Sequence, residues 1–378
     1  MNARIRTLAA TALPIVALVV FAVVVGAAVW ASAEAGTLGY DFLSYDVAVR
    51  RFLDGGVLYD QSFEYTGGFG LFYYPPPFVI LALPFALLEP SFAAWLWTGV
   101  LVAAFFAAVA AMPVSTRVKW LIVLLSGLDF PMIYGIKLGQ VGPILLLTFA
   151  LGWRFMDRPK VLGLATAIGT AIKIQPAIVF AWAILTGRRR AVMVGVVLLL
   201  VLAAAATLIA GPSSWVDQAT LLARLSKPIE TPHNFTPGRV AFELGASESV
   251  AWAIQWLNWG LVGVVLVVGI LRAAPVASYL AVVVASQLVS PILWDHYALL
   301  LVLPVAWLLE RGRWWAAAIL LVTMVWLVDV TPPIAYPVLY WVTFLAVLRE
   351  GWGGQPRSLR AGPLPQQGNP GPDAMLAS

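Results

Sequence analysis

The 378-residue sequence contains no cysteine and only two histidines, His233 and His296. Without thiols the chain can form no disulfide, no thiolate metal site, no cysteine-ligated iron–sulfur cluster and no cysteine nucleophile. Two histidines are also too few for a histidine-rich metal cage. Any chemistry must therefore come from carboxylates, amides, hydroxyls and basic groups.

Charged residues are scarce as well, at 11% of the chain, whereas 61% of the residues are hydrophobic. Soluble proteins are about 25% charged and about 45–50% apolar. The excess is typical of a polytopic membrane protein, whose spans of about 20 residues each use most of the length. We therefore expect one all-α membrane domain over residues 1–350. The net charge of +5 comes mostly from bases beside apolar segments, so it indicates topology and no nucleic-acid partner.

Apolar runs recur along the whole chain. The first, at about residues 8–30, is longer than the core of a signal peptide, and we predict a retained span with a cytoplasmic N-terminus. Further runs lie near 75–88, 92–112, 118–135, 139–155, 161–186, 190–211, 249–271, 274–290, 292–309, 313–329 and 333–349. This pattern predicts a bundle of about 10–12 transmembrane helices. Residues 31–74 and 212–248 are expected as extracytoplasmic loops, and the Pro/Gly/Gln-rich residues 351–378 as a disordered cytoplasmic tail.

The positions of the basic residues predict the orientation, because Lys and Arg favour short cytoplasmic loops. The bases at 188–190, 272, 311–313 and 349–360 fall on one side if the spans from residue 190 onward alternate, which makes the C-terminus cytoplasmic. Residues 31–74 then lie on the opposite side of the membrane, and they contain six acidic and two basic residues.

The topology between residues 75 and 187 has two solutions. If every apolar run is a full span, the loops with Arg117 and Lys119 and with Arg154, Arg158 and Lys160 are exterior. If residues 75–88 are re-entrant and the run 161–186 breaks near Lys173–Pro176, these bases return to the cytoplasm. We favour the break because Pro176 lacks a backbone donor and disfavours helical geometry in the residue before it. A break at membrane depth also implies a cavity, since irregular backbone there must face protein or water.

The first polar loop contains a predicted amphipathic helix from Asp41 to about Leu53, which ends at Gly55-Gly56. Its apolar residues recur every three or four positions, as expected for a helix on the outer membrane surface. Asp41 stands at the helix start. It either caps the helix or acts as a general base beside a substrate at the interface.

Polar residues inside apolar runs are further candidates. Lys173 lies within such a run, where a lysine costs about 2.5–3.5 kcal/mol unless it finds a partner. We predict that it binds a phosphate as a point charge. Gln140 follows a glycine at a span start, and its amide either bonds a neighbouring helix or contacts a ligand.

Two later segments carry the remaining candidates. His233-Asn234 lies between prolines in a stiff loop, with Arg239 a few residues on, and the alternative is a solvated loop without function. Asp295 and His296 lie at a turn between two long apolar runs. Adjacent residues do not share a helix face, so Asp295 is as well explained by a capping or packing role.

In their order and spacing these segments resemble the polyprenol-phosphate-sugar-dependent glycosyltransferases of family 87, which include mycobacterial phosphatidylinositol-mannoside mannosyltransferases. The matching motifs are Y-D-F-L-S-Y with G-G-V-L-Y-D, F-Y-Y-P-P-P, L-G-Q-V-G-P, A-I-K-I-Q-P, H-N-F-T and S-P-I-L-W-D-H-Y, over residues 40–300. The family often has asparagine where this chain has Gly142. An amide contact at that position is therefore not expected.

The resemblance implies a GT-C fold and an inverting transfer of a sugar from a polyprenyl phosphate. The sugar would be mannose, with a pentose as the alternative, and the acceptor a glycolipid or cell-envelope glycan at the outer face of the plasma membrane. Asp41 would be the general base, with Asp46 as the fallback. Lys173, His296 and Arg239 would bind the donor phosphate, and Gln140, His233, Asn234, Asp295 and Tyr74 the substrates. No metal or other cofactor is implied. The oligomeric state is not predicted.

Two other functions fit the composition. A secondary transporter of a polar or anionic solute would explain a broken segment and a lysine in an apolar run. It also predicts internal repeats with matching interruptions, and the long loop after the first span has no counterpart at mid-chain. A non-catalytic partner in cell-envelope assembly would not need Asp41 near Lys173 and His296.

Overall fold

A computed structural model describes residues 3–60 and 71–353, and within these residues the chain forms seventeen α-helices, three short 3-10 helices and no strands. The expectation of an all-α, multi-pass membrane protein is confirmed. The predicted disordered tail lies outside the described residues from position 354 onward, and so does part of the first polar loop, at 61–70.

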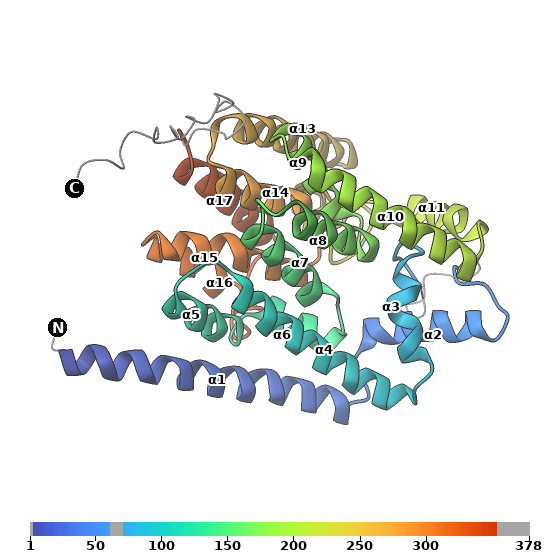
Figure 1. The fold of residues 1–378 in the computed structure, drawn as a ribbon, viewed down its shortest axis with the longest axis horizontal. Helices are drawn as coiled ribbons and strands as arrows, with labels where there is room; N and C mark the ends of the chain where they lie inside the picture. The colour runs from blue at the N-terminus through green and yellow to red at the C-terminus, as the bar shows by residue number, and fades with distance from the viewer. Residues whose placement is uncertain (1–2, 61–70, 354–378) are drawn as a thin grey trace, which may run out of the picture.

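Four helices are long and apolar enough to cross a membrane on their own: α1 (Ala3–Glu34), α4 (Pro90–Ala111), α10 (Arg189–Ala210) and α13 (Glu248–Arg272). They are exposed over much of their apolar surface, as on α10, where Leu200 is 65% and Leu208 is 88% exposed. Side chains of this kind suit contact with lipid. α1 runs along one edge of the bundle, from the left of the view to the region of α2 (Tyr40–Leu53) (Figure 1).

Most of the other apolar runs are interrupted. α6 (Phe130–Leu138) and α7 (Gly142–Arg154) meet at an angle of 118°. The predicted break near Lys173–Pro176 is confirmed, because α8 (Pro159–Ile172) ends there and α9 (Ile178–Leu185) follows a 3-10 turn. Arg188 Nε, after α9, donates to Met156 O, before α8, at 3.1 Å. α8 and α9 therefore form a hairpin with Lys173 at its tip.

A second break joins two distant parts of the chain. α5 (Thr116–Ser126) and α6 are separated by residues 127–129, and α16 (Ala317–Leu321) ends nearby. Phe130 N donates to Thr323 O at 2.8 Å, and Val325 N donates to Leu128 O at 2.9 Å. Each irregular segment thus satisfies backbone groups of the other, which buried backbone requires. The runs expected at 118–135 and 313–329 are for this reason not continuous helices.

The remaining elements are shorter and complete the bundle. They are α3 (Phe78–Ala86), α11 (Ser213–Leu225), α12 (Pro237–Glu243), α14 (Pro275–Leu288), η2 (Asp295–Leu301), α15 (Val302–Glu310), η3 (Trp314–Ala316) and α17 (Ala335–Glu350). α14 and α15 are almost completely buried and form the centre of the core. α2, α3 and α11 lie together at the right end of the view (Figure 1).

Hydrogen bonds tie the basic loops together at the other end of the bundle. Arg154 Nη1 donates to Ala111 O, and Ser115 donates to Glu310. Arg311 and Arg313 both pair with Glu350, and the link from Arg188 to Met156 adds the loop after α9. The structure thus matches the second of the two topologies, in which the bases between α4 and α9 share a side with the later basic loops.

α2 differs from its prediction in two respects. The helix begins at Tyr40, and its N-cap is Gly39, which makes no side-chain cap. The capping interpretation of Asp41 is therefore wrong, because Asp41 lies inside the first turn. The helix also does not rest its apolar face on lipid: Phe42, Tyr45 and Val49 are at most 2% exposed and pack among α3, α4 and α6.

Candidate functional site

Two glycine turns bring Asp41 to its neighbours. Gly39 and Gly139 have φ of 71° and 74°, a left-handed conformation that costs glycine little. Gly39 N donates to Lys137 O at 2.8 Å, and Trp97 Nε1 donates to Gly139 O at 2.7 Å. The start of α2 is thereby attached to the α6–α7 corner, which places Asp41 beside Gln140.

Gln140 links Asp41 to two buried tyrosines. Its Nε2 donates to Asp41 Oδ2, and its Oε1 accepts from Tyr74 Oη at 3.2 Å. The hydroxyls of Tyr74 and Tyr45 are 2.6 Å apart. Since the tyrosines orient the amide and the amide orients the carboxylate, Asp41 has a defined direction within the site.

Lys173 reaches the site from the tip of the α8–α9 hairpin. Its Nζ donates to Tyr297 Oη at 2.5 Å and lies 3.7 Å from the centre of the Tyr297 ring. Among the described residues Lys173 forms no salt bridge. The lysine is therefore held in place by a neutral group, and in its protonated form it can bind an anion.

His296 is 6% exposed and is oriented by its neighbour in the chain. Its Nδ1 lies 3.2 Å from Asp295 Oδ1, and its backbone N–H donates to the same oxygen at 2.6 Å. The imidazole stacks on Trp294, with ring centres 6.3 Å apart. Within the part of the chain that the structure describes, Nε2 has no hydrogen-bond partner. A buried polar atom in this state is expected to meet water or a ligand.

One small pocket lies among these side chains, with a cavity volume of about 10 Å³, which is room for about one water molecule. It is lined by Gln140, Gly142, Leu145, Lys173, Gln175, Gln287, His296, Tyr297 and Leu300. Three glutamine amides, a lysine and a histidine supply its polar surface.

Burial raises the pKa of the Asp41 carboxyl above the usual value of 3.8, while His296 and the hydrogen bond from Gln140 act in the opposite direction. Desolvation penalises the charged form of a carboxyl group, and positive charge or donated hydrogen bonds favour it. A carboxylate with a raised pKa is a stronger base than an exposed one. Asp41 therefore has a property that a general base requires.

The structure brings together six of the predicted site residues, which come from five separate segments of the chain. They are Asp41, Tyr74, Gln140, Lys173, Asp295 and His296.

Asp46 lies one turn further along α2. It pairs with Arg50 at 2.7 Å and is 2% exposed, and Arg50 also donates to Leu88 O at 2.5 Å. These contacts connect α2 to the end of α3.

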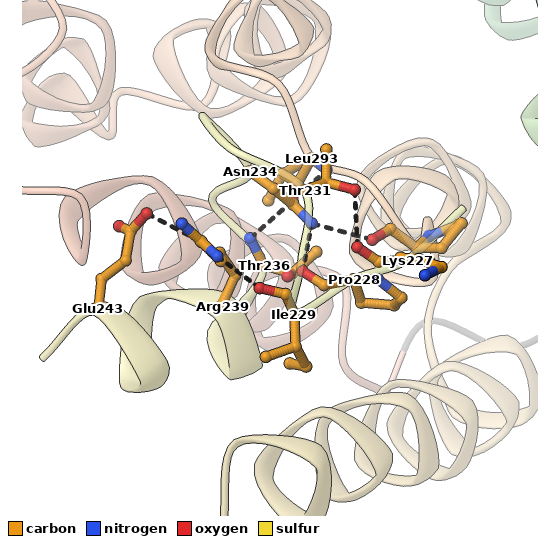
Figure 2. A network of polar contacts seen from close by, with 10 residues as sticks. Lys227, Pro228, Ile229, Thr231, Asn234, Thr236, Arg239, Glu243 and Leu293 are labelled. Carbon is orange, nitrogen blue, oxygen red and sulfur yellow. Dashed lines mark hydrogen bonds and ion pairs between the residues drawn. The ribbon is translucent and has the colours of Figure 1, made fainter. Parts of the chain in front are cut away.

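Asn234 and Arg239 take part in a separate network (Figure 2). The Asn234 amide donates to Pro228 O at 2.8 Å and to Pro291 O at 3.1 Å, and its oxygen accepts from Leu293 N at 2.8 Å. Arg239 pairs with Glu243 at 2.9 Å and donates to Ile229 O.

Asn234 bonds both to Pro228, in the loop between α11 and α12, and to Pro291 and Leu293, in the segment 290–294. It therefore holds the loop that carries Asp295 and His296. His233 is exposed and has a positive φ of 53°.

Several site residues were not predicted. Tyr297 follows His296 in the motif W-D-H-Y, and Gln175 lies two residues after Lys173 in K-I-Q-P. Their closeness in the sequence to predicted residues is the signal that could have identified them. Gln175 Nε2 donates to Ser290 Oγ at 3.0 Å. Tyr45 had the same signal, because it precedes Asp46 and ends the motif Y-D-F-L-S-Y. Gln287 gave no such signal, because it lies on an otherwise largely apolar helix.

Comparison with known proteins gives one match. The sequence profile of Glycosyltransferase family 87 matches residues 72–291, which is more than half of the chain. No curated protein and no solved structure matches this sequence.

Proposed function

The chain belongs to glycosyltransferase family 87, and from this premise we propose that it transfers a sugar from a polyprenyl phosphate to a glycolipid or cell-envelope glycan. The observation that supports this proposal is that two basic groups, Lys173 and His296, line one small pocket together with Gln140, which donates a hydrogen bond to the carboxylate of Asp41. A donor with a lipid tail reaches such a site from the bilayer. Only its polar head has to reach these side chains.

The reaction requires one proton acceptor and one leaving-group site. An acceptor hydroxyl attacks the anomeric carbon, its proton passes to Asp41, and the carbon–oxygen bond to phosphate breaks with inversion. The bonding electrons leave with the polyprenyl phosphate. Because the phosphate is already a good leaving group, the protein mainly has to position the two substrates and stabilise the departing charge.

Lys173 and His296 are suited to that stabilisation. The Lys173 ammonium has a neutral hydroxyl as its partner and keeps two further donors for phosphate oxygens. Asp295 Oδ1 lies 3.2 Å from His296 Nδ1 and can accept a hydrogen bond from it. The imidazolium form of histidine carries protons on both ring nitrogens, and in that form Nε2 can donate to the leaving oxygen. No metal and no other cofactor is part of this proposal.

The glutamine amides of the pocket are the groups proposed to contact the sugar. Amides both donate and accept, so Gln140, Gln175 and Gln287 can bond to ring hydroxyls with the donors and acceptors that their protein partners leave free. Mannose is the proposed sugar, and a pentose is the alternative. We place the reaction on the extracytoplasmic side of the plasma membrane, because the basic loops lie at the other end of the bundle.

The first test replaces the proposed base. Purified Asp41→Asn protein in lipid, incubated without metal and with a panel of polyprenyl phosphate sugars, should lose at least about 100-fold in released polyprenyl phosphate, in line with the loss of a general base. Asp46→Asn is the matched control, since it changes the same residue type one turn away. Full transfer by Asp41→Asn would reject the assignment, and activity in the double variant would reject the mechanism.

The second test concerns the donor phosphate. Lys173→Ala should weaken donor binding. The KM for the polyprenyl phosphate sugar should rise, and the KM for the acceptor should change less. Lys173→Arg should restore part of the affinity. The control is Lys227→Ala, which removes an exposed lysine paired with Glu230 at 2.7 Å. Unchanged donor affinity in Lys173→Ala would return this lysine to a structural role.

A further inference from the structure

A second group of cations lies at the opposite end of the bundle from the pocket, where α4 ends. Lys119 Nζ donates to Ala110 O at 2.7 Å, and Arg154 Nη1 donates to Ala111 O at 3.3 Å. Both bases therefore bind the last carbonyls of the same helix. Carbonyls at a helix C-terminus lack intrahelical partners and carry partial negative charge, which favours cations there.

A third cation joins them through an aromatic ring. The guanidinium groups of Arg154 and Arg158 lie 5.5 and 5.1 Å from the centre of the Phe155 ring. Arg154 is also close enough to Lys119 for the two charges to repel each other. We call Lys119, Arg154 and Arg158 the α4-end cluster.

The α4-end cluster contains no compensating acid. Within residues 3–60 and 71–353 none of its three members forms an ion pair with a carboxylate, and the nearby Asp157 pairs with Arg188. Arg154 and Arg158 are exposed, and Lys119 is partly exposed. Three like charges are thus held together by neutral carbonyls and one ring, an arrangement that an added anion would stabilise.

The depth of the cluster identifies the class of anion. α4 has 22 residues and is one of the helices able to span a membrane. Its length is about 33 Å at 1.5 Å per residue, close to the roughly 30 Å thickness of the hydrocarbon core. The end of α4 therefore lies at the level of the lipid headgroups, where the available anions are phosphates.

We propose that the α4-end cluster is a binding site for the phosphate headgroup of an anionic phospholipid. The exposed charges of Arg154 and Arg158 contact the phosphate oxygens, and the partly exposed Lys119 adds a third positive charge to the site. The site is separate from glycosyl transfer and does not depend on which sugar or acceptor the protein uses.

The test measures binding of phosphatidylglycerol and phosphatidylcholine with the same acyl chains to the full-length protein in detergent, by native mass spectrometry. The protein should prefer phosphatidylglycerol. Removal of each cation should reduce that preference about fivefold, as expected from about 1 kcal/mol per basic residue at a membrane surface. The test variant is Arg154→Gln/Arg158→Gln, which changes exposed side chains, and Lys119→Gln is added to it in a second variant.

The control is Arg189→Gln/Arg349→Gln, which removes two exposed arginines from the same end of the protein. It should keep the preference. Equal binding of the two lipids by the unmodified protein, or equal loss in the control, would overturn the proposal. So would displacement of bound phosphatidylglycerol by millimolar glycerol 3-phosphate, because the site would then take a soluble phosphate. If the double variant elutes as aggregate, Arg158→Gln alone is measured instead. Its preference for phosphatidylglycerol should be about fivefold lower than that of the unmodified protein.

Discussion

At the residue scale, the direction of the Asp41 carboxylate depends on the Gln140 amide. Gln140 donates to Asp41 and accepts from Tyr74, so its oxygen and nitrogen have assigned positions. A reversed amide would direct a carbonyl at the carboxylate and lose the bond to Asp41. Gln140 is therefore a positioning residue, because it acts through Asp41.

The acid limb of the pH profile tests this role. The pKa of Asp41 is raised above 3.8 by burial, and only the ionised carboxylate accepts a proton, so transfer should fall as the pH drops through that raised pKa. The Gln140 hydrogen bond favours the ionised form. Gln140→Met should therefore raise the pKa further and move the acid limb to higher pH, with a lower kcat.

Gln175→Met is the matched control for this experiment. It removes another amide of the same pocket, which bonds to Ser290 and not to Asp41. Its acid limb should coincide with that of the unmodified protein. If Gln140→Met lowers activity equally at every pH, the amide has no influence on the titration of Asp41.

At the element scale, the α6–α7 corner requires a glycine for two reasons. Gly139 has a positive φ of 74°, and a Cβ at this position would lie 2.7 Å from the Cβ of Phe42 in α2. The first feature costs an alanine about 1–2 kcal/mol. The second forces α2 away from the corner, with a further cost of about 1–3 kcal/mol.

Gly139→Ala should therefore lower the melting temperature and also reduce transfer, because α2 carries Asp41. Gly36→Ala separates the two effects. Gly36 also has a positive φ, of 65°, but a Cβ there would meet nothing within 4 Å. Melting temperatures in one detergent should fall in the order unmodified, Gly36→Ala, Gly139→Ala. Equal melting temperatures and activities for the two variants would show that the approach of Phe42 is unimportant.

The element scale also shows what could be predicted from the sequence. The break at Lys173–Pro176 was predictable because Pro176 is a local signal. The break at residues 127–129 was not, since its partner segment is far away in the chain: Thr323 donates to Asp129 across 194 residues. The start of α2 was misplaced by one residue because Gly39 is recognised as an N-cap only when its contact with Lys137 is known.

The same distinction applies to the candidate site. Asp41, Lys173 and His296 were found because charged or ionisable groups are conspicuous in apolar sequence and because the motifs resemble a family. The contacts of Asn234 and Arg239 with Pro228, Ile229 and Leu293 were not predictable. These contacts depend on how two loops pack together. Every residue has a backbone carbonyl, so the sequence does not indicate which carbonyl accepts a hydrogen bond.

At the scale of the whole molecule, the absence of cysteine offers a direct test of orientation, because every introduced thiol is the only one present. α10 and α13 are both candidate spans. Arg189 begins α10, next to the loop tied to Met156, and Arg272 ends α13, where Gly353 N donates to its carbonyl at 3.3 Å. Ser213 and Ser249 lie near the opposite ends of these helices, and all four side chains are exposed.

If the basic loops are cytoplasmic, a membrane-impermeant maleimide added to intact cells should label Ser213→Cys and Ser249→Cys. Arg189→Cys and Arg272→Cys should react only after the membrane is permeabilised. Because each helix is probed at both ends, every helix provides its own control for expression and thiol reactivity. The opposite pattern would place the Asp41 pocket on the cytoplasmic side, where nucleotide-linked sugars are available, and would remove the reason for a lipid-linked donor. Labelling at both ends of α10 would show instead that this helix does not cross the membrane, and the bundle would then need a different arrangement of spans around the α8–α9 hairpin.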